Sequence, residues 1–113
     1  SMCDFSGADL RGANLSGADL RGAQLQRTHL DDADLHTARL GPLLNVGESH
    51  RDFRTDLSHA KLVRADLTGA DLTQVNLDSV DFSGAILNGA DLSGAQTEHA
   101  ILGGASMNGT KLV

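Results

Sequence analysis

The sequence is poor in the residues that define several common protein classes. Among 113 residues there are three Phe, no Tyr, no Trp, one Pro and one Cys. A single cysteine, Cys3, excludes an internal disulfide framework, and a single proline excludes a proline-rich linker. No apolar run approaches the roughly 20 residues of a membrane-spanning helix. The formal net charge of −6 argues against electrostatic binding to nucleic acid or to an anionic membrane, because both need a basic surface.

A five-residue period fills most of the chain. From residue 8 it reads ADLRG, ANLSG, ADLRG, AQLQR, and it resumes at residue 55 as TDLSH, AKLVR, ADLTG. There are 20 such repeats, with Leu in the third position of 16 and Ala in the first position of 14. The third position is otherwise Phe5, Phe82, Thr97 or Met107. One column is therefore large and apolar, a second is small, and the other three positions carry most of the charges.

Neither an α-helix nor a simple strand explains this period, because side chains repeat every 3.6 residues in a helix and every two in a strand. The pattern predicts a chain that turns after every five residues, with Leu pointing inward. One such segment buries almost no surface, so stability requires successive turns to stack. The glycines that often end a repeat are expected at the corners, where a positive φ is needed.

The A-[D/N]-L-x-x pattern over residues 3–40 and 55–113 resembles the pentapeptide repeat family. The resemblance implies an all-β fold, a right-handed, four-sided β-helix, in which the Leu or Phe and the preceding small residue face inward. Four repeats would then make one coil, and equivalent residues in neighbouring coils would stack about 4.8 Å apart. Twenty repeats correspond to five coils.

The register of the repeats breaks once. Central residues fall at 5, 10 and so on to 40, then resume at 57, so residues 41–54 are predicted to be an insertion that leaves the solenoid. We expect Leu57 to stack on Leu25. The chain is thus predicted to be one domain, residues 1–113, with two coils in 1–40 and three coils in 55–113.

Two interpretations of the insertion remain open. Its apolar side chains could fold back over the solenoid as packing, and residues 43–52 could form a short helix. Alternatively, it is a loop that recognises a protein, because rigid scaffolds often carry function on loops and because Arg and Phe are favoured at interfaces. The candidate interaction residues are Leu43, Leu44, His50, Arg51, Phe53 and Arg54.

No catalytic, cofactor or metal site is predicted. The five histidines lack a ligand spacing such as H-x-x-x-H, and Cys3 lies at an inward small position that suits a core residue. Charges that stack between coils, such as Arg11 with Asp31 and Asp19 with Arg39, are expected to form exposed ion pairs. Thr97 should weaken its otherwise apolar column, so Thr97→Leu is expected to raise the melting temperature.

The predicted function is a non-enzymatic scaffold that binds an unidentified protein partner, located in the cytoplasm, with neither direct nucleic-acid binding nor membrane insertion. End-to-end pairing of two copies is a further expectation, because β-solenoids expose their ends. The resemblance also implies an alternative, since some family members mimic a DNA duplex and modulate or protect DNA gyrase. This chain differs from those members because it is shorter and because basic residues lie among its acidic ones.

Overall fold

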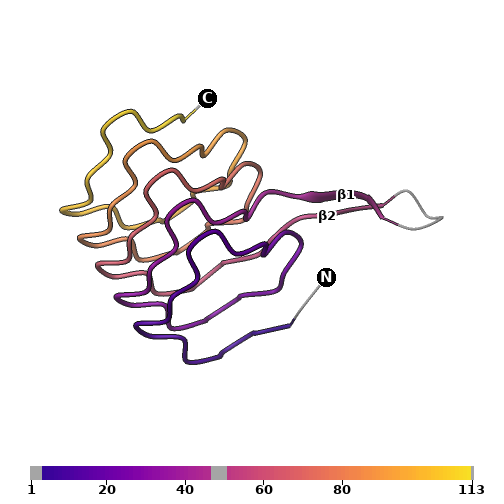
Figure 1. The fold of residues 1–113 in the computed structure, drawn as a ribbon, viewed down its shortest axis with the longest axis horizontal. Coiled ribbons are helices and arrows are strands. Elements are labelled where there is room, and N and C mark those ends of the chain that lie inside the picture. The colour runs from indigo at the N-terminus through magenta and orange to yellow at the C-terminus, as the bar shows by residue number, and fades with distance from the viewer. Residues whose placement is uncertain (1–3, 47–50, 113) are drawn as a thin grey trace.

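In a computed structural model, which describes residues 4–46 and 51–112, the chain winds into a right-handed, four-sided β-helix of five coils (Figure 1). Each side of a coil consists of one five-residue repeat, and its second residue forms a parallel backbone bridge with the equivalent residue of each neighbouring coil. The fold expected from the resemblance is confirmed. Within the described ranges no helix is long and apolar enough to cross a membrane.

The four sides are defined by columns of bridged residues at the second repeat position. One side runs Asp4, Gln24, Asp56, Asn76, Gln96, and the next runs Asp9, His29, Lys61, Asp81, Ile101. The third runs Asn14, Asp34, Asp66, Ile86, Ser106, and the fourth runs Asp19, Arg39, Asp71, Asp91, Lys111. The register across the insertion is as predicted, because Gln24 pairs with Asp56 and the N–H of Leu25 donates to Asp56 O at 2.7 Å.

The core is built from the first and third repeat positions. In the second, third and fourth coils these residues are at most 4% exposed, including Leu35, Leu67 and Phe82. In the first coil Phe5, Leu10, Leu15 and Leu20 are only partly buried. Burial therefore falls from the middle coils toward both ends, as expected where a coil has a neighbour on one side only.

The corners have a constant backbone conformation. Except at Pro42, where the hairpin leaves the solenoid, the residue at the fifth repeat position has a positive φ, whether it is Gly, as at Gly12 with φ 70°, or not, as at His59 with φ 62°. An N–H to C=O bond spans each corner, for example from Ala13 N to Leu10 O at 3.0 Å. The predicted role of the glycines is confirmed, but within residues 4–46 and 51–112 eight non-glycine residues adopt the same conformation: Arg27, Asp32, Thr37, His59, Arg64, Gln74, Ser79 and His99.

The preference for Asp or Asn at the second position has a local cause that the sequence did not reveal. Its side-chain oxygen accepts a hydrogen bond from the N–H two residues later, as from Ser83 N to Asp81 Oδ1 at 2.9 Å. The same bond forms from Ser58 N to Asp56 Oδ1 at 2.9 Å. These Asx turns satisfy a corner N–H and explain why a short polar acceptor recurs there.

The insertion forms an antiparallel β-hairpin. Strand β1, Leu43–Val46, pairs with strand β2, Arg51–Phe53, with Leu43 opposite Phe53. The hairpin extends away from the coils (Figure 1). The short helix that was one interpretation of residues 43–52 is therefore wrong, because the described residues of this segment form strands whose backbone extends away from the coils (Figure 1). An antiparallel pair lets both limbs bond their backbone groups to each other while the chain leaves and re-enters at neighbouring points.

The last coil is open to solvent. Thr97 faces the inside of the solenoid, where it shares a cavity with Phe82, Leu92 and Met107, but it is exposed because no further coil covers it in this chain. Leu112, in the same coil, is 64% exposed. Thr97 is thus an inward residue in an uncovered coil, which limits what its replacement can gain.

Candidate functional site

The base of the hairpin is held by tight packing at Gly41. This residue is buried, and a β-carbon placed on it would lie 2.9 Å from Thr73 Oγ1 and 3.0 Å from Asp71 Oδ2. The Asp71 carboxylate and the Thr73 hydroxyl are already hydrogen-bonded to each other, because Asp71 Oδ1 accepts from Thr73 N and Thr73 Oγ1 at 3.0 and 2.7 Å. A residue larger than Gly at this exit would displace that corner.

Thr55, which follows strand β2, holds the base of the hairpin on the side opposite Gly41. At other corners the fifth-position N–H donates to the C=O of the next coil, as Gly17 N does to His36 O at 3.0 Å. The insertion interrupts this pattern at Gly22, whose N–H instead donates to Thr55 Oγ1 at 2.9 Å. The Thr55 hydroxyl in turn lies 3.3 Å from Gly41 O, to which it can donate. This buried hydroxyl relays a bond between two coils where the chain departs.

The candidate interaction residues lie on or beside this hairpin. Leu43 and Leu44 belong to β1, and Arg51 and Phe53 belong to β2. Arg54 follows β2 and is exposed. His50 lies outside the residues that the structure describes. The backbone thus gathers the described candidates on one projecting element.

A second cluster comes from the third side of the solenoid. Asp34 and Asp66 are bridged on neighbouring coils, and His36 lies two residues after Asp34. The ligand atoms of the three residues lie within 4.8 Å of one another, and His36 Nδ1 is 2.6 Å from Asp34 Oδ1. The sequence prediction missed this group because it looked for histidine pairs, and Asp66 joins the other two only through the register across the insertion.

The two ionisable partners shift each other's pKa in opposite directions. The hydrogen bond that the His36 ring donates to the Asp34 carboxylate, and then the charge of Asp34, raise the pKa of His36 above its ordinary value of 6.5. The hydrogen bond from His36 lowers the pKa of Asp34 below its ordinary value of 3.8. The charge of Asp66 also favours the protonated imidazole, to a smaller extent.

The other ion pairs are mostly local. Arg11 bonds Asp9 with Nε and Nη2 at 2.8 and 2.7 Å, which lowers the pKa of Asp9 to about 2. Arg21 bonds Asp19 in the same way at 2.8 Å. The predicted side-chain pairs of Arg11 with Asp31 and of Asp19 with Arg39 are thus replaced by pairs within one repeat.

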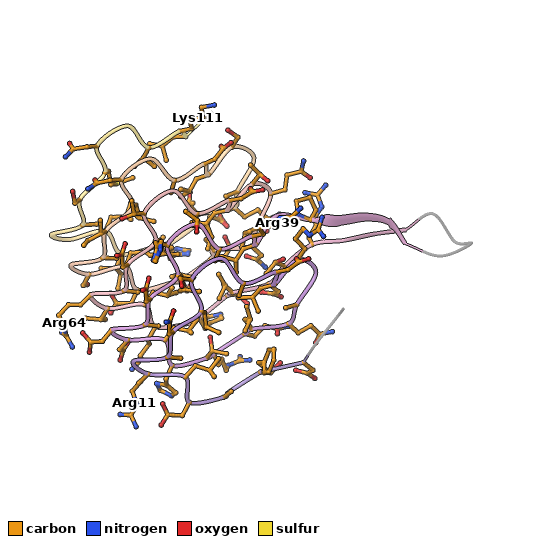
Figure 2. All side chains as sticks on the ribbon, in the orientation of Figure 1. Arg11, Arg39, Arg64 and Lys111 are labelled. Atoms are coloured by element: carbon orange, nitrogen blue, oxygen red, sulfur yellow. The ribbon has the colours of Figure 1, made fainter. Side chains whose placement is uncertain are left out.

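One arginine does pair between coils. Arg64 Nε lies 2.9 Å from Asp32 Oδ1, and these residues stack across the insertion. Labelled basic side chains, Arg11, Arg39, Arg64 and Lys111, occur at well-separated places on the solenoid (Figure 2). The acidic side chains are therefore interrupted by basic ones on several parts of the surface.

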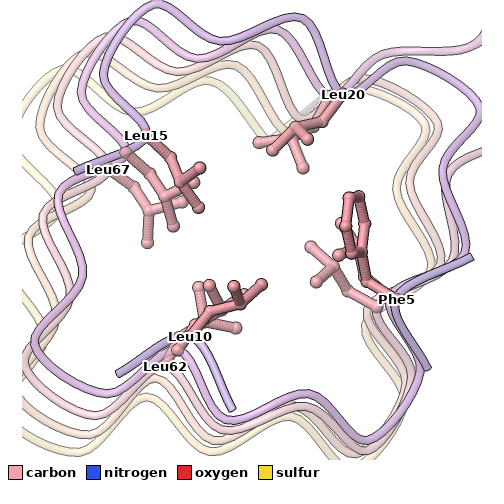
Figure 3. Close-up of a pocket in the computed structure, with 11 residues that line it drawn as sticks. Phe5, Leu10, Leu15, Leu20, Leu62 and Leu67 are labelled. Atoms are coloured by element: carbon pink, nitrogen blue, oxygen red, sulfur yellow. The ribbon is translucent and has the colours of Figure 1, made fainter. Parts of the chain in front are cut away.

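The interior at the N-terminal end contains a small apolar cavity of about 120 Å³ (Figure 3). Only central repeat residues line it, among them Phe5, Leu10, Leu15 and Leu20. No side chain of this lining carries a polar group that could orient a substrate. We therefore interpret the cavity as imperfect packing of the core in the first coils.

The repeats also match a family model. The model for pentapeptide repeats aligns in 8 copies with residues 3–41 and 53–89, which together exceed half of the chain. The chain belongs to the pentapeptide repeat family. The first aligned segment ends at residue 41 and the second begins at residue 53, so most of the hairpin lies outside the repeats that the model describes in this pentapeptide repeat protein.

Solved structures of other pentapeptide repeat proteins are similar along most of the chain. Rfr23 from the cyanobacterium Cyanothece 51142 is 33% identical, with a TM-score of 0.82 over 94% of this chain and 65% of its own. A protein from the Arabidopsis thaliana thylakoid lumen is 33% identical, with a TM-score of 0.74 over 89% of this chain and 62% of its own. The chain thus spans just under two thirds of both relatives. No curated protein matches it.

Proposed function

We propose that this pentapeptide repeat protein is a non-enzymatic scaffold that presents its β-hairpin to a protein partner. The supporting observation is that the hairpin projects from an otherwise regular solenoid (Figure 1). The inward-facing residues of that solenoid pack in its core. Gly41 and Thr55 hold the base of that element through buried contacts. A rigid base reduces the conformational entropy lost when the hairpin binds.

The hairpin suits recognition by strand addition. It is a two-stranded sheet, so each strand has one edge that the other does not occupy. An extended segment of a partner can add to such an edge through main-chain hydrogen bonds, with side chains such as Arg54 beside it. Strand addition therefore defines a partner chemistry: an extended polypeptide segment.

The test compares three immobilised proteins in affinity capture from the source organism. One is intact, one has residues 43–52 replaced by a Gly/Ser linker, and one carries Asp81→Asn, on a side of the solenoid. A partner retained by the intact protein and by Asp81→Asn, but lost with the linker, supports the proposal. Equal retention by all three contradicts it and directs attention to the sides of the solenoid.

The alternative, a DNA mimic that modulates gyrase, makes a different demand on the surface. It requires a continuous acidic face, whereas Arg11, Arg21 and Arg64 each neutralise an Asp where they lie. A supercoiling assay with gyrase tests it. Inhibition that disappears at high salt would be a general electrostatic effect, and inhibition that persists would favour the alternative.

Cytoplasmic location and end-to-end pairing of two copies belong to the proposal and have separate tests. Fractionation of the source cells addresses the first, and sedimentation analysis of the purified chain addresses the second. Neither result alters the test of the hairpin, because the capture experiment compares variants of the same chain.

A further inference from the structure

We infer that Asp34, His36 and Asp66 form a binding site for a divalent transition-metal ion, with Zn²⁺ as the best fit. The three ligand atoms, two carboxylate oxygens and one imidazole nitrogen, lie within 4.8 Å of one another. Around a tetrahedral Zn²⁺, with bonds of about 2.0–2.2 Å, ligand atoms lie roughly 3.3–3.6 Å apart. The observed spread is close enough for side-chain rotation to complete the site.

The solenoid supplies the geometry. Asp34 and Asp66 are paired in register on the third side, so their carboxylates stack between neighbouring coils. The corner turn after Asp34 directs His36 back toward it, and His36 N donates to Asp34 Oδ1 at 3.1 Å. Rotation of the His36 ring away from its 2.6 Å contact with Asp34 makes room for an ion between the side chains.

Hydrogen bonds orient both carboxylates. Asp66 Oδ1 accepts from Thr68 N and Thr68 Oγ1 at 3.0 and 2.6 Å, and Asp34 Oδ1 accepts from His36 N. Among the described residues these bonds fall on Oδ1 of each group, which leaves Oδ2 to act as a ligand. Such bonds around a metal ligand fix its orientation and strengthen binding.

The charge of the surroundings also favours a cation. The column that contains the two aspartates, Asn14, Asp34, Asp66, Ile86 and Ser106, has no Lys or Arg. A bound divalent ion would offset the repulsion between the stacked carboxylates. The other stacked aspartates, Asp71 and Asp91, lie between Arg39 and Lys111 in their column, so their charge is already opposed.

The imidazole decides which metal is bound. Oxygen ligands alone suit Mg²⁺ or Ca²⁺, whereas an imidazole with carboxylates suits Zn²⁺ and its neighbours in the first transition row. With three protein ligands on an exposed surface, water completes the coordination. Because Asp34 and Asp66 belong to the coils on either side of the insertion, the ion would also link those two coils.

The test is titration of the purified chain with ZnCl₂ by calorimetry, with Cys3→Ser in every variant to remove the free thiol. We expect one Zn²⁺ per chain, and weakening by about tenfold or more in His36→Gln and in Asp66→Asn. The matched controls are His99→Gln, another exposed histidine, and Asp91→Asn, a stacked carboxylate without a histidine. Both should bind Zn²⁺ as the parent does.

A measurement on the parent chain keeps the test independent of the variants. In ¹H–¹⁵N spectra of the histidine rings, Zn²⁺ should shift the His36 nitrogens before those of His99. Absence of binding up to about 1 mM Zn²⁺, or affinity unchanged in His36→Gln and Asp66→Asn, overturns the inference. Equal affinity for Mg²⁺ also overturns it, because the imidazole would then have no role.

Discussion

At the scale of single residues, the clearest prediction concerns the Thr55 hydroxyl. Thr55→Val keeps the shape but removes the group between Gly22 N and Gly41 O, and leaves both without that partner. An unpaired buried backbone group costs about 1–3 kcal/mol, so we expect a loss of that order in the free energy of unfolding. Urea denaturation of the variant measures it.

Thr28→Val is the matched control. Thr28 is also fully buried at a first repeat position, and its hydroxyl donates to Leu25 O at 2.9 Å. That carbonyl keeps a second donor, Thr28 N, at 3.2 Å. Thr28→Val should therefore cost less than Thr55→Val, and an equal or larger cost would show that the relay at the insertion has no special importance.

His36 gives a prediction on pH. Its raised pKa means that the protonated ring stabilises the fold below about 6.5, and that this contribution is lost as the pH rises through the folded-state pKa. The lowered pKa of Asp34 means that its contribution is present above about 3.8 and lost as the pH falls through its folded-state value. The pair is therefore most favourable between the two.

Metal-free NMR titration measures this directly. The pKa of His36 should lie above its ordinary value of 6.5, and Asp34→Asn should move it back toward that value. If Asp34→Asn leaves the pKa of His36 unchanged, the contact between the two side chains is not formed in solution.

The local ion pairs show what the sequence could not predict at this scale. Stacking of Asp19 with Arg39 was predicted correctly, and the two residues are bridged. However, the Asx turn holds the Asp19 carboxylate next to the N–H of Arg21. The guanidinium of Arg21 therefore lies beside this carboxylate and forms the ion pair in place of Arg39. The Asp34–His36 contact follows the same rule, that the side chain two residues after such an Asp lies beside its carboxylate. Applied to the sequence, this rule would have predicted the contact between Asp34 and His36.

At the scale of elements, the repeats predicted the sides and corners of the solenoid but not the shape of the insertion. Leu and Ala columns are periodic over 20 repeats, so the side chains that must be buried are unambiguous. Residues 41–54 have no period, and their mixture of apolar and charged residues fits a helix or a hairpin. The hairpin forms because both limbs must start and finish at adjacent points of one corner.

Replacement of the hairpin should leave the solenoid folded. Strands β1 and β2 pair with each other, and the anchoring contacts of Gly41 and Thr55 lie outside residues 43–52. We expect a Gly/Ser linker at 43–52 to move the melting temperature by less than about 4 °C, which corresponds to roughly 1 kcal/mol for a chain of this size. Calorimetry measures the shift.

This variant is also the control that the capture experiment needs. If the linker protein melts far below the parent, the hairpin contributes to the stability of the coils. Loss of a partner would then no longer identify the hairpin as the binding surface, and point substitutions such as Arg54→Ala would have to replace the linker.

At the scale of the whole molecule, stability follows from the stacking of coils, so the effect of a substitution depends on its position along the axis. Thr97 faces inward next to Leu92 and Met107 but in the exposed last coil. Thr97→Leu should raise the melting temperature only slightly, with a gain below about 1 kcal/mol, because much of the added surface stays in water. Thr97→Val isolates the hydroxyl, and a fall in melting temperature with both variants would contradict the inward orientation.

The same gradient predicts opposite outcomes for one substitution at two places. Leu67 is fully buried between coils, whereas Leu112 occupies an equivalent repeat position but is 64% exposed. Leu67→Ala removes buried methyl groups and leaves a cavity, at a cost of about 2–5 kcal/mol. Leu112→Ala should cost less than about 1 kcal/mol, since most of that side chain is already in water. Urea denaturation of the two variants decides the matter: equal losses would mean that another surface covers the last coil in solution, and that the end of this solenoid is not free.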